Sequence, residues 1–232
     1  MSTATPAPVI WITGLSGVGK TCLASALSAR IAATFPEVVH LDGDLFRQAT
    51  TTDPNSPQHF SPQARRQRAA AIADLADQHS ARGAPVVVST ISLFHAVQQH
   101  NRQRWPLYAE VLLQCPMTLL AKRYPQRYGP GTASSSYVGA GQNPEFPHQA
   151  ELTLQQDFSP SSLTTHLDQV WPLWLNLQHR WQASSFKPLF PSGRAESVAE
   201  SRPAEPGFKP LSPRGRGVGE RGQNPPPRRP VR

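Results

Sequence analysis

A glycine-rich segment near the start of the chain has the spacing of a phosphate-binding loop. Residues 14–21 read Gly-Leu-Ser-Gly-Val-Gly-Lys-Thr, a full match to the pattern G-x-x-x-x-G-K-[S/T]. Glycines let successive N–H groups point inward, and the dipole of a following helix favours a polyphosphate there. We expect Lys20 to reach the β- and γ-phosphates of ATP and Thr21 to offer its hydroxyl to Mg²⁺. The cofactor-binding loop therefore comprises Gly14, Leu15, Ser16, Gly17, Val18, Gly19, Lys20 and Thr21.

Two acids and an arginine form the second chemical signal. Asp42, Asp44 and Arg47 follow an apolar run over 38–42 that has the composition of a strand. In an open parallel sheet, ligands bind outside the carboxyl ends of the strands. These side chains could hold Mg²⁺, orient an attacking hydroxyl and pair with a substrate phosphate. The alternative is that the two acids cap the next helix, and we favour the functional interpretation because the glycine-rich loop ends its strand on the same edge.

Strands and helices alternate along the chain in the order that such a site requires. Strands are predicted at residues 9–13, 38–42, 85–91, 108–115 and, more weakly, 150–154. Helices are predicted at residues 21–34, from Ser61-Pro62 as far as Gly83, from Met117 onward, and at residues 161–182. In the last of these, Pro172 would kink the helix or start a second one. The fold class is therefore α/β, with a parallel sheet of about five strands and helices on both faces.

Composition divides the chain into a kinase-sized domain and two flanking segments. We predict a flexible N-terminus over residues 1–8, one domain over 9–183, and a disordered tail over 184–232, which is rich in Pro, Arg and Gly. Within the domain, residues 124–148 are rich in Pro, Gly and Ser and are predicted to form a lid, with a mobile segment as the alternative.

Charge, cysteines and hydropathy exclude several classes of protein. The formal net charge is +8, but the stretch after residue 191 supplies much of it, so the high pI says little about the domain's ligands. Two cysteines, Cys22 and Cys115, make no disulfide framework, and a cytoplasmic location is the simplest. No run is long and apolar enough to span a membrane, and the eight histidines show no metal-ligand clustering. The arginines at 65, 66 and 68 could form a nucleic-acid patch, but a small anionic substrate is favoured.

These residues resemble the adenylylsulfate kinases, P-loop NTPase-fold enzymes that phosphorylate the 3′-hydroxyl of adenosine 5′-phosphosulfate. The likeness covers about residues 9–155, and the acid pair after the loop makes it fairly specific. The matching pieces, in order, are Trp11-Ile12-Thr13-Gly14-Leu15-Ser16-Gly17, Leu41-Asp42-Gly43-Asp44 with Arg47, Phe60-Ser61 followed by Arg65, Ile91-Ser92, and Glu145 with Pro147 ahead of Glu151-Leu152.

The resemblance implies a role for each matching residue. Asp42 looks like the acid that activates the acceptor hydroxyl or organises Mg²⁺, and Lys20 joins it as a catalytic residue. Ser92 matches a serine often labelled as a phosphorylated intermediate. Direct transfer needs no such intermediate, so a hydroxyl that contacts substrate or closes the strand end is the alternative. The remaining implied contacts are Asp44, Arg47, Phe60 (stacked on the base), Arg65 (on the phosphosulfate) and Ile91 for the substrate, and Arg123 for the cofactor.

Departures from the family pattern bear on the acceptor. Arg68 stands where relatives usually have an asparagine, and the lid begins Arg123-Tyr124-Pro125-Gln126-Arg127, without the family's acid and lysine. Three further features resemble a subgroup of the family that is encoded among surface-polysaccharide genes, and some members of that subgroup phosphorylate cytidine diphosphoramidate. These features are Ser92-Leu93-Phe94, Asn101-Arg102, and Val138-Gly139 in the lid.

Three hypotheses follow. The first is an adenylylsulfate kinase of sulfate activation, and the second is a kinase for another nucleotide such as cytidine diphosphoramidate. The third is a nucleotide-binding module without catalysis, which the altered lid supports. The resemblance also implies that the binding partner is a small nucleotide substrate and that the protein forms a homodimer.

Overall fold

The computed structural model describes residues 5–53, 56–132 and 137–185. Residues 1–4 and nearly all of the predicted tail lie outside the described residues. Within the described part, no helix has the length and apolar character needed to cross a lipid bilayer.

A five-stranded parallel sheet forms the centre of the domain, as predicted. The strands lie in the order β2-β3-β1-β4-β5, and every neighbouring pair is parallel. Because both faces of such a sheet are covered, its central strands read as nearly continuous apolar runs. The strands are β1 (Val9–Thr13), β2 (Val39–Asp42), β3 (Val86–Ser89), β4 (Tyr108–Gln114) and β5 (Leu152–Gln155).

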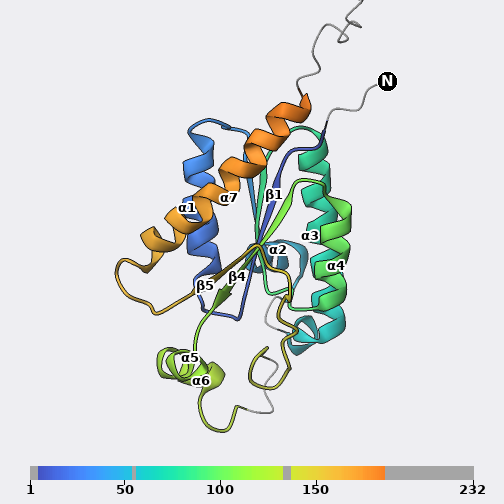
Figure 1. Ribbon diagram of the computed structural model, residues 1–232. Helices are drawn as coiled ribbons and strands as arrows, with labels where there is room; N and C mark the ends of the chain where they lie inside the picture. The colour runs from blue at the N-terminus through green and yellow to red at the C-terminus, as the bar shows by residue number, and fades with distance from the viewer. Residues whose placement is uncertain (1–4, 54–55, 133–136, 186–232) are drawn as a thin grey trace, which may run out of the picture. The chain divides into compact units, whose positions relative to one another are not determined.

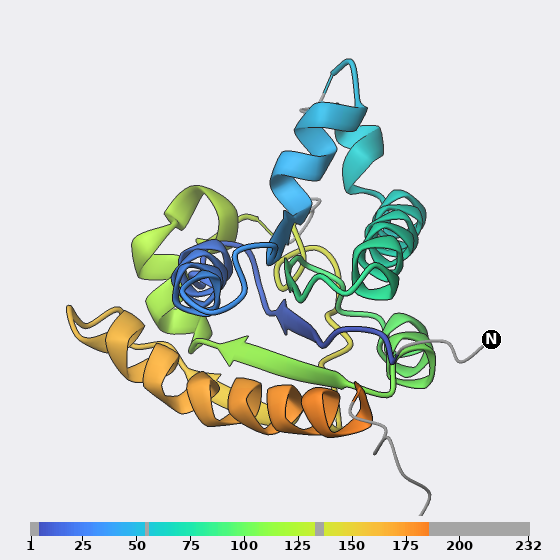
Figure 2. The same ribbon diagram turned by 90° about the horizontal axis from the view of Figure 1, so that it is seen from above.

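Helices cover both faces of the sheet, which confirms the predicted α/β class. Helices α1 and α7 lie on one face, and α3 and α4 lie on the other (Figures 1 and 2). Alternate residues of β1 serve the two layers: Ile10 and Ile12 pack with α1 and α7, and Val9 and Trp11 pack with α3. The helices are α1 (Lys20–Ala32), α2 (Gly43–Thr50), α3 (Pro62–Ala81), α4 (His95–Arg104), α5 (Met117–Arg123), α6 (Pro125–Tyr128) and α7 (Ser162–Ser185), with a 3₁₀ helix η1 (Pro57–Phe60).

Helix α3 begins and ends as its sequence predicts. The Ser61 hydroxyl accepts a hydrogen bond from the amide of Ala64 at 3.2 Å, and Pro62 occupies the first helical position. Past the other end, Gly83 adopts φ +86°, a left-handed conformation that favours glycine. These local signals fix the helix that carries the arginines of the site.

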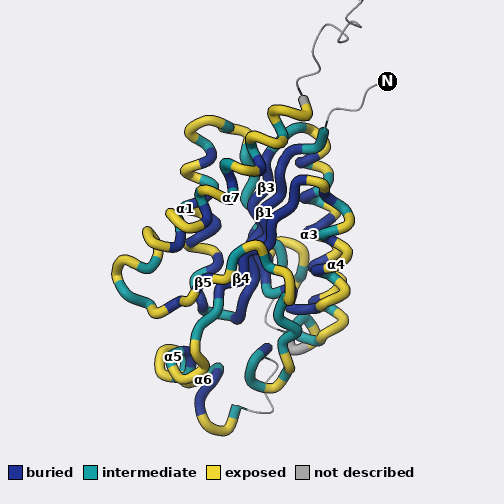
Figure 3. Tube along the Cα trace, viewed as in Figure 1, coloured by how far each residue is buried: buried dark blue, intermediate teal, exposed yellow. Residues whose placement is uncertain are grey.

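Helix α7 corrects one prediction. Pro172 lies inside a single helix that runs from Ser162 to Ser185, so the alternative of a second helix starting there is wrong. Val170, Trp174 and Leu177 are all buried in the core, on both sides of the proline. Their burial holds the two halves of the helix on the sheet and offsets the missing backbone donor. The buried strands and the exposed outer helix surfaces are visible in Figure 3.

Candidate active site

The glycine-rich loop joins β1 to α1 at the carboxyl edge of the sheet. Gly14 and Gly17 adopt φ +146° and +83°, where other residues are strained. A side chain at Gly14 would collide with the Leu113 carbonyl oxygen, and one at Gly17 would collide with the Tyr124 ring. The fold therefore requires glycine at both positions, and the loop lies between a strand and a helix as the phosphate-binding mechanism demands.

Lys20 is held at the base of the cavity. Its side chain is 8% exposed, and Nζ donates a hydrogen bond to the Leu15 carbonyl oxygen at 2.9 Å. Burial lowers the pKa of Lys20 to about 8, although Asp44 and Asp42 act in the opposite direction. No carboxylate of the described residues forms an ion pair with the ammonium group, so it could bind a phosphate. The side chains of Leu15 and Val18 are buried in the core, so these two loop residues offer a ligand their main chain.

Asp42 is the most connected polar residue of the site. Its Oδ1 accepts the amides of Asp44 at 2.9 Å and Leu45 at 3.0 Å, and so caps α2. Its Oδ2 accepts the hydroxyls of Thr21 and Ser89, each at 2.7 Å. Burial opposes ionisation, but these four hydrogen bonds outweigh it and place the pKa of Asp42 below its ordinary value. The carboxylate thus caps a helix and also joins the second strand to the glycine-rich loop.

The Thr21 and Asp42 oxygens are suitable ligands for a hard cation. Magnesium prefers oxygen donors and usually keeps several waters and substrate phosphates in its shell. Among the described residues, no group of three or more His, Cys, Asp or Glu side chains could hold a metal by itself. Any Mg²⁺ at this place would therefore be shared between these two residues, water and a nucleotide.

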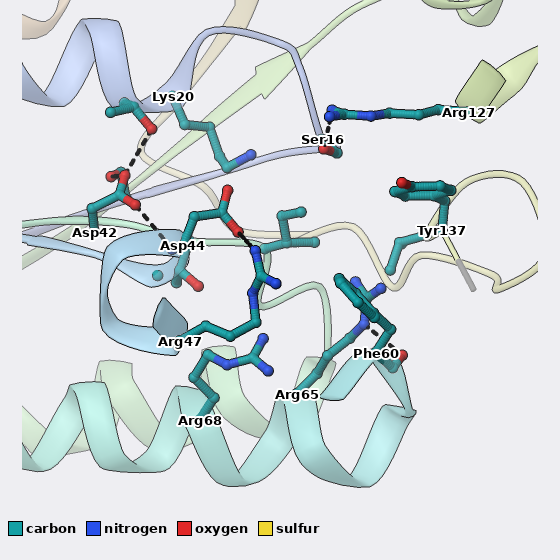
Figure 4. Close-up of a pocket in the computed structure, with 16 residues that line it drawn as sticks. Ser16, Lys20, Asp42, Asp44, Arg47, Phe60, Arg65, Arg68, Arg127 and Tyr137 are labelled. Atoms are coloured by element: carbon teal, nitrogen blue, oxygen red, sulfur yellow. Dashed lines mark hydrogen bonds and ion pairs between the residues drawn. The ribbon is translucent and has the colours of Figure 1, made fainter. Parts of the chain in front are cut away.

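A second set of side chains faces the loop across the same cavity (Figure 4). Arg65 is 6% exposed, and its Nε donates to the Phe60 carbonyl oxygen at 2.9 Å. Arg47 lies 3.2 Å from Asp44 Oδ1 and 5.0 Å from the centre of the Phe60 ring. The lining comprises the predicted residues Ser16, Lys20, Thr21, Asp42, Asp44, Arg47, Phe60, Arg65 and Ile91, together with Gly43, Arg68, Ser89, Thr90, Arg127, Tyr137 and Val138.

The lining of this cavity is strongly basic. Among the described residues, five cationic side chains face two carboxylates, Asp42 and Asp44. Burial, and next the neighbouring Arg68, lower the pKa of Arg65 to about 10. Burial and Arg47 likewise lower the pKa of Arg68. The arrangement favours ligands that carry several negative charges.

Arg127 and Tyr137, from the predicted lid segment, complete the cavity and were not predicted as site residues. Arg127 Nη1 donates to the Ser16 hydroxyl at 2.9 Å, and the Tyr128 hydroxyl donates to the Ser16 carbonyl oxygen at 2.9 Å. The Tyr137 ring lies 5.5 Å from the Arg127 guanidinium and 6.5 Å from the Phe60 ring. The sequence signal for Arg127 was its position near the start of the predicted lid, where the chain departs from the family pattern.

Ser92 and Arg123 lie outside the cavity lining, as do the loop residues Gly14, Leu15, Gly17, Val18 and Gly19. Ser92 is 1% exposed, and its hydroxyl accepts a hydrogen bond from the Trp11 indole at 2.7 Å. That position fits the alternative in which the hydroxyl closes the strand end. Arg123 stacks over the Phe158 ring, 4.5 Å from its centre, beside the end of α5.

The fold and this cavity are those of a P-loop kinase. The chain matches the profile of the family described as adenylylsulphate kinase over residues 6–155. The chain belongs to that family.

Individual relatives agree with this assignment. A cytidine diphosphoramidate kinase from Campylobacter jejuni is 31% identical over 115 residues, which cover 50% of this chain and 65% of that protein. A probable adenylyl-sulfate kinase from Archaeoglobus fulgidus is 35% identical over 118 residues, covering 51% and 74%. An adenylyl-sulfate kinase from Paraburkholderia xenovorans is 30% identical over 160 residues, covering 66% and 85%. The chain thus spans less than two thirds of the Campylobacter protein.

Solved structures share the fold. The APS kinase CysC of Mycobacterium tuberculosis, in complex with AMPPNP and APS, superimposes with a TM-score of 0.58 at 24% identity. The match covers 73% of this chain and 98% of that one. At this identity the likeness concerns the arrangement of strands and helices.

Proposed function

We propose that the protein transfers the γ-phosphoryl group of ATP to the 3′-hydroxyl of a nucleotide, with adenosine 5′-phosphosulfate as one candidate acceptor. The observation that carries the proposal is a single cavity in which Lys20, Thr21 and Asp42 face Arg47, Phe60 and Arg65. Membership of the adenylylsulphate kinase family supports the same reaction.

The loop half of the cavity would hold the donor, ATP with Mg²⁺. The loop amides and Lys20 would bind the phosphates, while Thr21 and Asp42 would hold the cation. Mg²⁺ would supply charge neutralisation on the transferring phosphoryl group. The bond between the γ-phosphorus and its bridging oxygen breaks, ADP leaves, and a new bond forms to the acceptor oxygen, whose proton is released.

The hydrogen bonds of Asp42 favour one of its two predicted roles. The carboxylate accepts four hydrogen bonds, and its pKa is lowered. A carboxylate stabilised in its ionised form is a weak base, so Asp42 serves cation binding better than proton abstraction. Asp44, whose side chain is largely exposed at the cavity, is better placed to orient the acceptor hydroxyl.

The opposite half of the cavity would hold the acceptor. The Phe60 ring offers a face for the base, and Arg47 and Arg65 offer guanidinium groups for the anionic 5′ substituent. Catalysis would then consist mainly of positioning two anionic reactants and neutralising their charge.

A second candidate acceptor is cytidine diphosphoramidate. The observation that favours it is the similarity to the Campylobacter jejuni kinase of that name. The donor half of the reaction would be unchanged, because the proposal places the acceptor base on Phe60, away from the loop, Thr21 and Asp42.

A coupled assay of ADP release against both acceptors tests the proposal. We expect magnesium-dependent turnover with one acceptor and none with the Lys20→Ala variant. If nucleotide binds normally but neither acceptor gives turnover, the transfer reaction is contradicted and the non-catalytic hypothesis is favoured.

A further inference from the structure

Helix α3 places a second arginine beside the acceptor. Arg65 and Arg68 are three residues apart and therefore lie on the same face of the helix. Both line the cavity, and Figure 4 shows the Arg68 side chain rising from α3 toward Arg47 and the Arg65 side chain rising toward Phe60. Arg68 is half-buried, and its Nη2 donates to the His59 carbonyl oxygen at 2.7 Å. One edge of its guanidinium is thereby fixed while the group remains part of the cavity wall.

Arg68 adds a positive charge to a cavity lining in which cationic side chains already outnumber carboxylates. In the described part of the chain, Asp44 is the carboxylate that acts on all three guanidinium groups, and it already pairs with Arg47 at 3.2 Å. Arg68 lowers the pKa of Arg65, and Arg47 lowers the pKa of Arg68, in each case after burial, because like charges repel in a partly desolvated site. A ligand anion relieves that repulsion, and a more highly charged anion relieves more of it.

We propose that Arg68 makes the acceptor site selective for nucleotides that end in a phosphoryl group, the nucleoside 5′-diphosphates, over those that end in a sulfate. A terminal phosphate carries close to two negative charges near neutral pH and has three strong acceptor oxygens, which suit a guanidinium fork. A terminal sulfate carries one charge. The inference rests on the proposed function in taking this half of the cavity as the acceptor site.

Calorimetry with the donor site filled isolates the acceptor site. Protein saturated with Mg²⁺ and AMPPNP is titrated with CDP, with ADP and with adenosine 5′-phosphosulfate. The variants are Arg68→Asn and Arg68→Lys, with Arg66→Asn as the matched control, because Arg66 is an exposed arginine of the same helix outside this cavity. Thermal melting checks that each variant is folded.

We expect the wild-type protein to bind the diphosphates about tenfold more tightly than the phosphosulfate, a ratio typical of one charge-assisted contact. Arg68→Asn should abolish that ratio, Arg68→Lys should retain part of it, and Arg66→Asn should leave it unchanged. A wild-type preference for the phosphosulfate, or a ratio that Arg68→Asn does not alter, would overturn the inference.

A transfer assay on the same samples separates this inference from the proposed function. Turnover with a preference independent of Arg68 contradicts the inference alone. Arg68-dependent binding of diphosphates without turnover of any of the three nucleotides contradicts the transfer reaction alone.

Discussion

The two halves of the cavity are built in different ways. The donor half comes from one continuous segment, residues 14–21, and from the ends of the adjacent strands β2 and β3. The acceptor half comes from three consecutive elements, α2, η1 and α3, and from Arg127, Tyr137 and Val138, which lie much later in the sequence. The donor half is therefore fixed by local backbone geometry, whereas the acceptor half depends on how separate elements pack.

Because the two halves are built from different elements, we expect substitutions in the donor half and in the acceptor half to have different kinetic effects. A change in the donor half should reduce turnover with every acceptor, because all reactions share the phosphoryl group. A change in the acceptor half should alter the acceptor's KM or the choice of acceptor, and leave ATP binding intact.

Lys20→Ala should have the largest effect. Its ammonium group is the cation nearest the base of the loop, and we expect a loss of about 10³-fold or more in kcat/KM with any acceptor. The coupled assay measures this loss, and circular dichroism checks the fold. Lys122→Ala, an exposed lysine of α5, is the control and should retain full activity. If Lys20→Ala retained activity, the assignment of this half of the cavity to ATP would be contradicted.

Asp42→Asn should come next, with a loss of about 10²-fold in kcat. Asparagine keeps an oxygen that can cap α2 but lacks the negative charge that would hold Mg²⁺. The magnesium dependence of the rate should move to higher concentration. Asp74→Asn, which alters an exposed ion pair with Arg104, is the control. An unchanged magnesium dependence would contradict the cation-binding role.

Arg65→Ala should raise the acceptor's KM about tenfold or more and leave the KM for ATP nearly unchanged. The guanidinium is buried at the acceptor side of the cavity, where Nε donates to the Phe60 carbonyl oxygen at 2.9 Å. Steady-state kinetics with each substrate varied in turn provides the measurement. Equal changes in both KM values would mean that the two halves are not separable.

The pH dependence of kcat/KM for ATP should follow the ionisation of Lys20 in the donor half of the cavity. Lys20 has its pKa lowered to about 8, so its charge in the free protein is present below that pH and is lost above it. We expect kcat/KM for ATP to fall about tenfold for each pH unit above about 8, while kcat falls at higher pH because bound phosphates stabilise the ammonium. A flat profile for kcat/KM up to about pH 10 would contradict this assignment.

Glu110→Gln should affect stability and neither half of the cavity. Burial raises the pKa of Glu110 to about 7 from 4.5, with Arg102 opposing and Glu151 adding to the rise. Between these values the folded state binds more protons, so the free energy of unfolding falls as pH rises through this window. The variant should lack that fall, which amounts to about 3 kcal/mol. Urea unfolding at several pH values tests it, and an unchanged pH dependence would contradict it.

The sequence predicted the donor half more completely than the acceptor half for a physical reason. The glycine pattern and its flanking elements specify a local backbone shape, and the five strands follow from short apolar runs. Helix α4, by contrast, is polar along most of its length and shows no clear periodicity. Arg127 and Tyr137 reach the cavity through packing of a Pro- and Gly-rich segment, which no local pattern reveals. The buried hydrogen bond between Ser92 and Trp11 could not be inferred from spacing, because the two residues are brought together only by the packing of separate elements.

Calorimetric titration of Mg²⁺ and AMPPNP into the protein tests the central claim most directly. The account predicts one nucleotide bound per chain, with affinity lost or greatly reduced in Lys20→Ala. Absence of binding to the wild-type protein, or equal affinity in the variant, would contradict it.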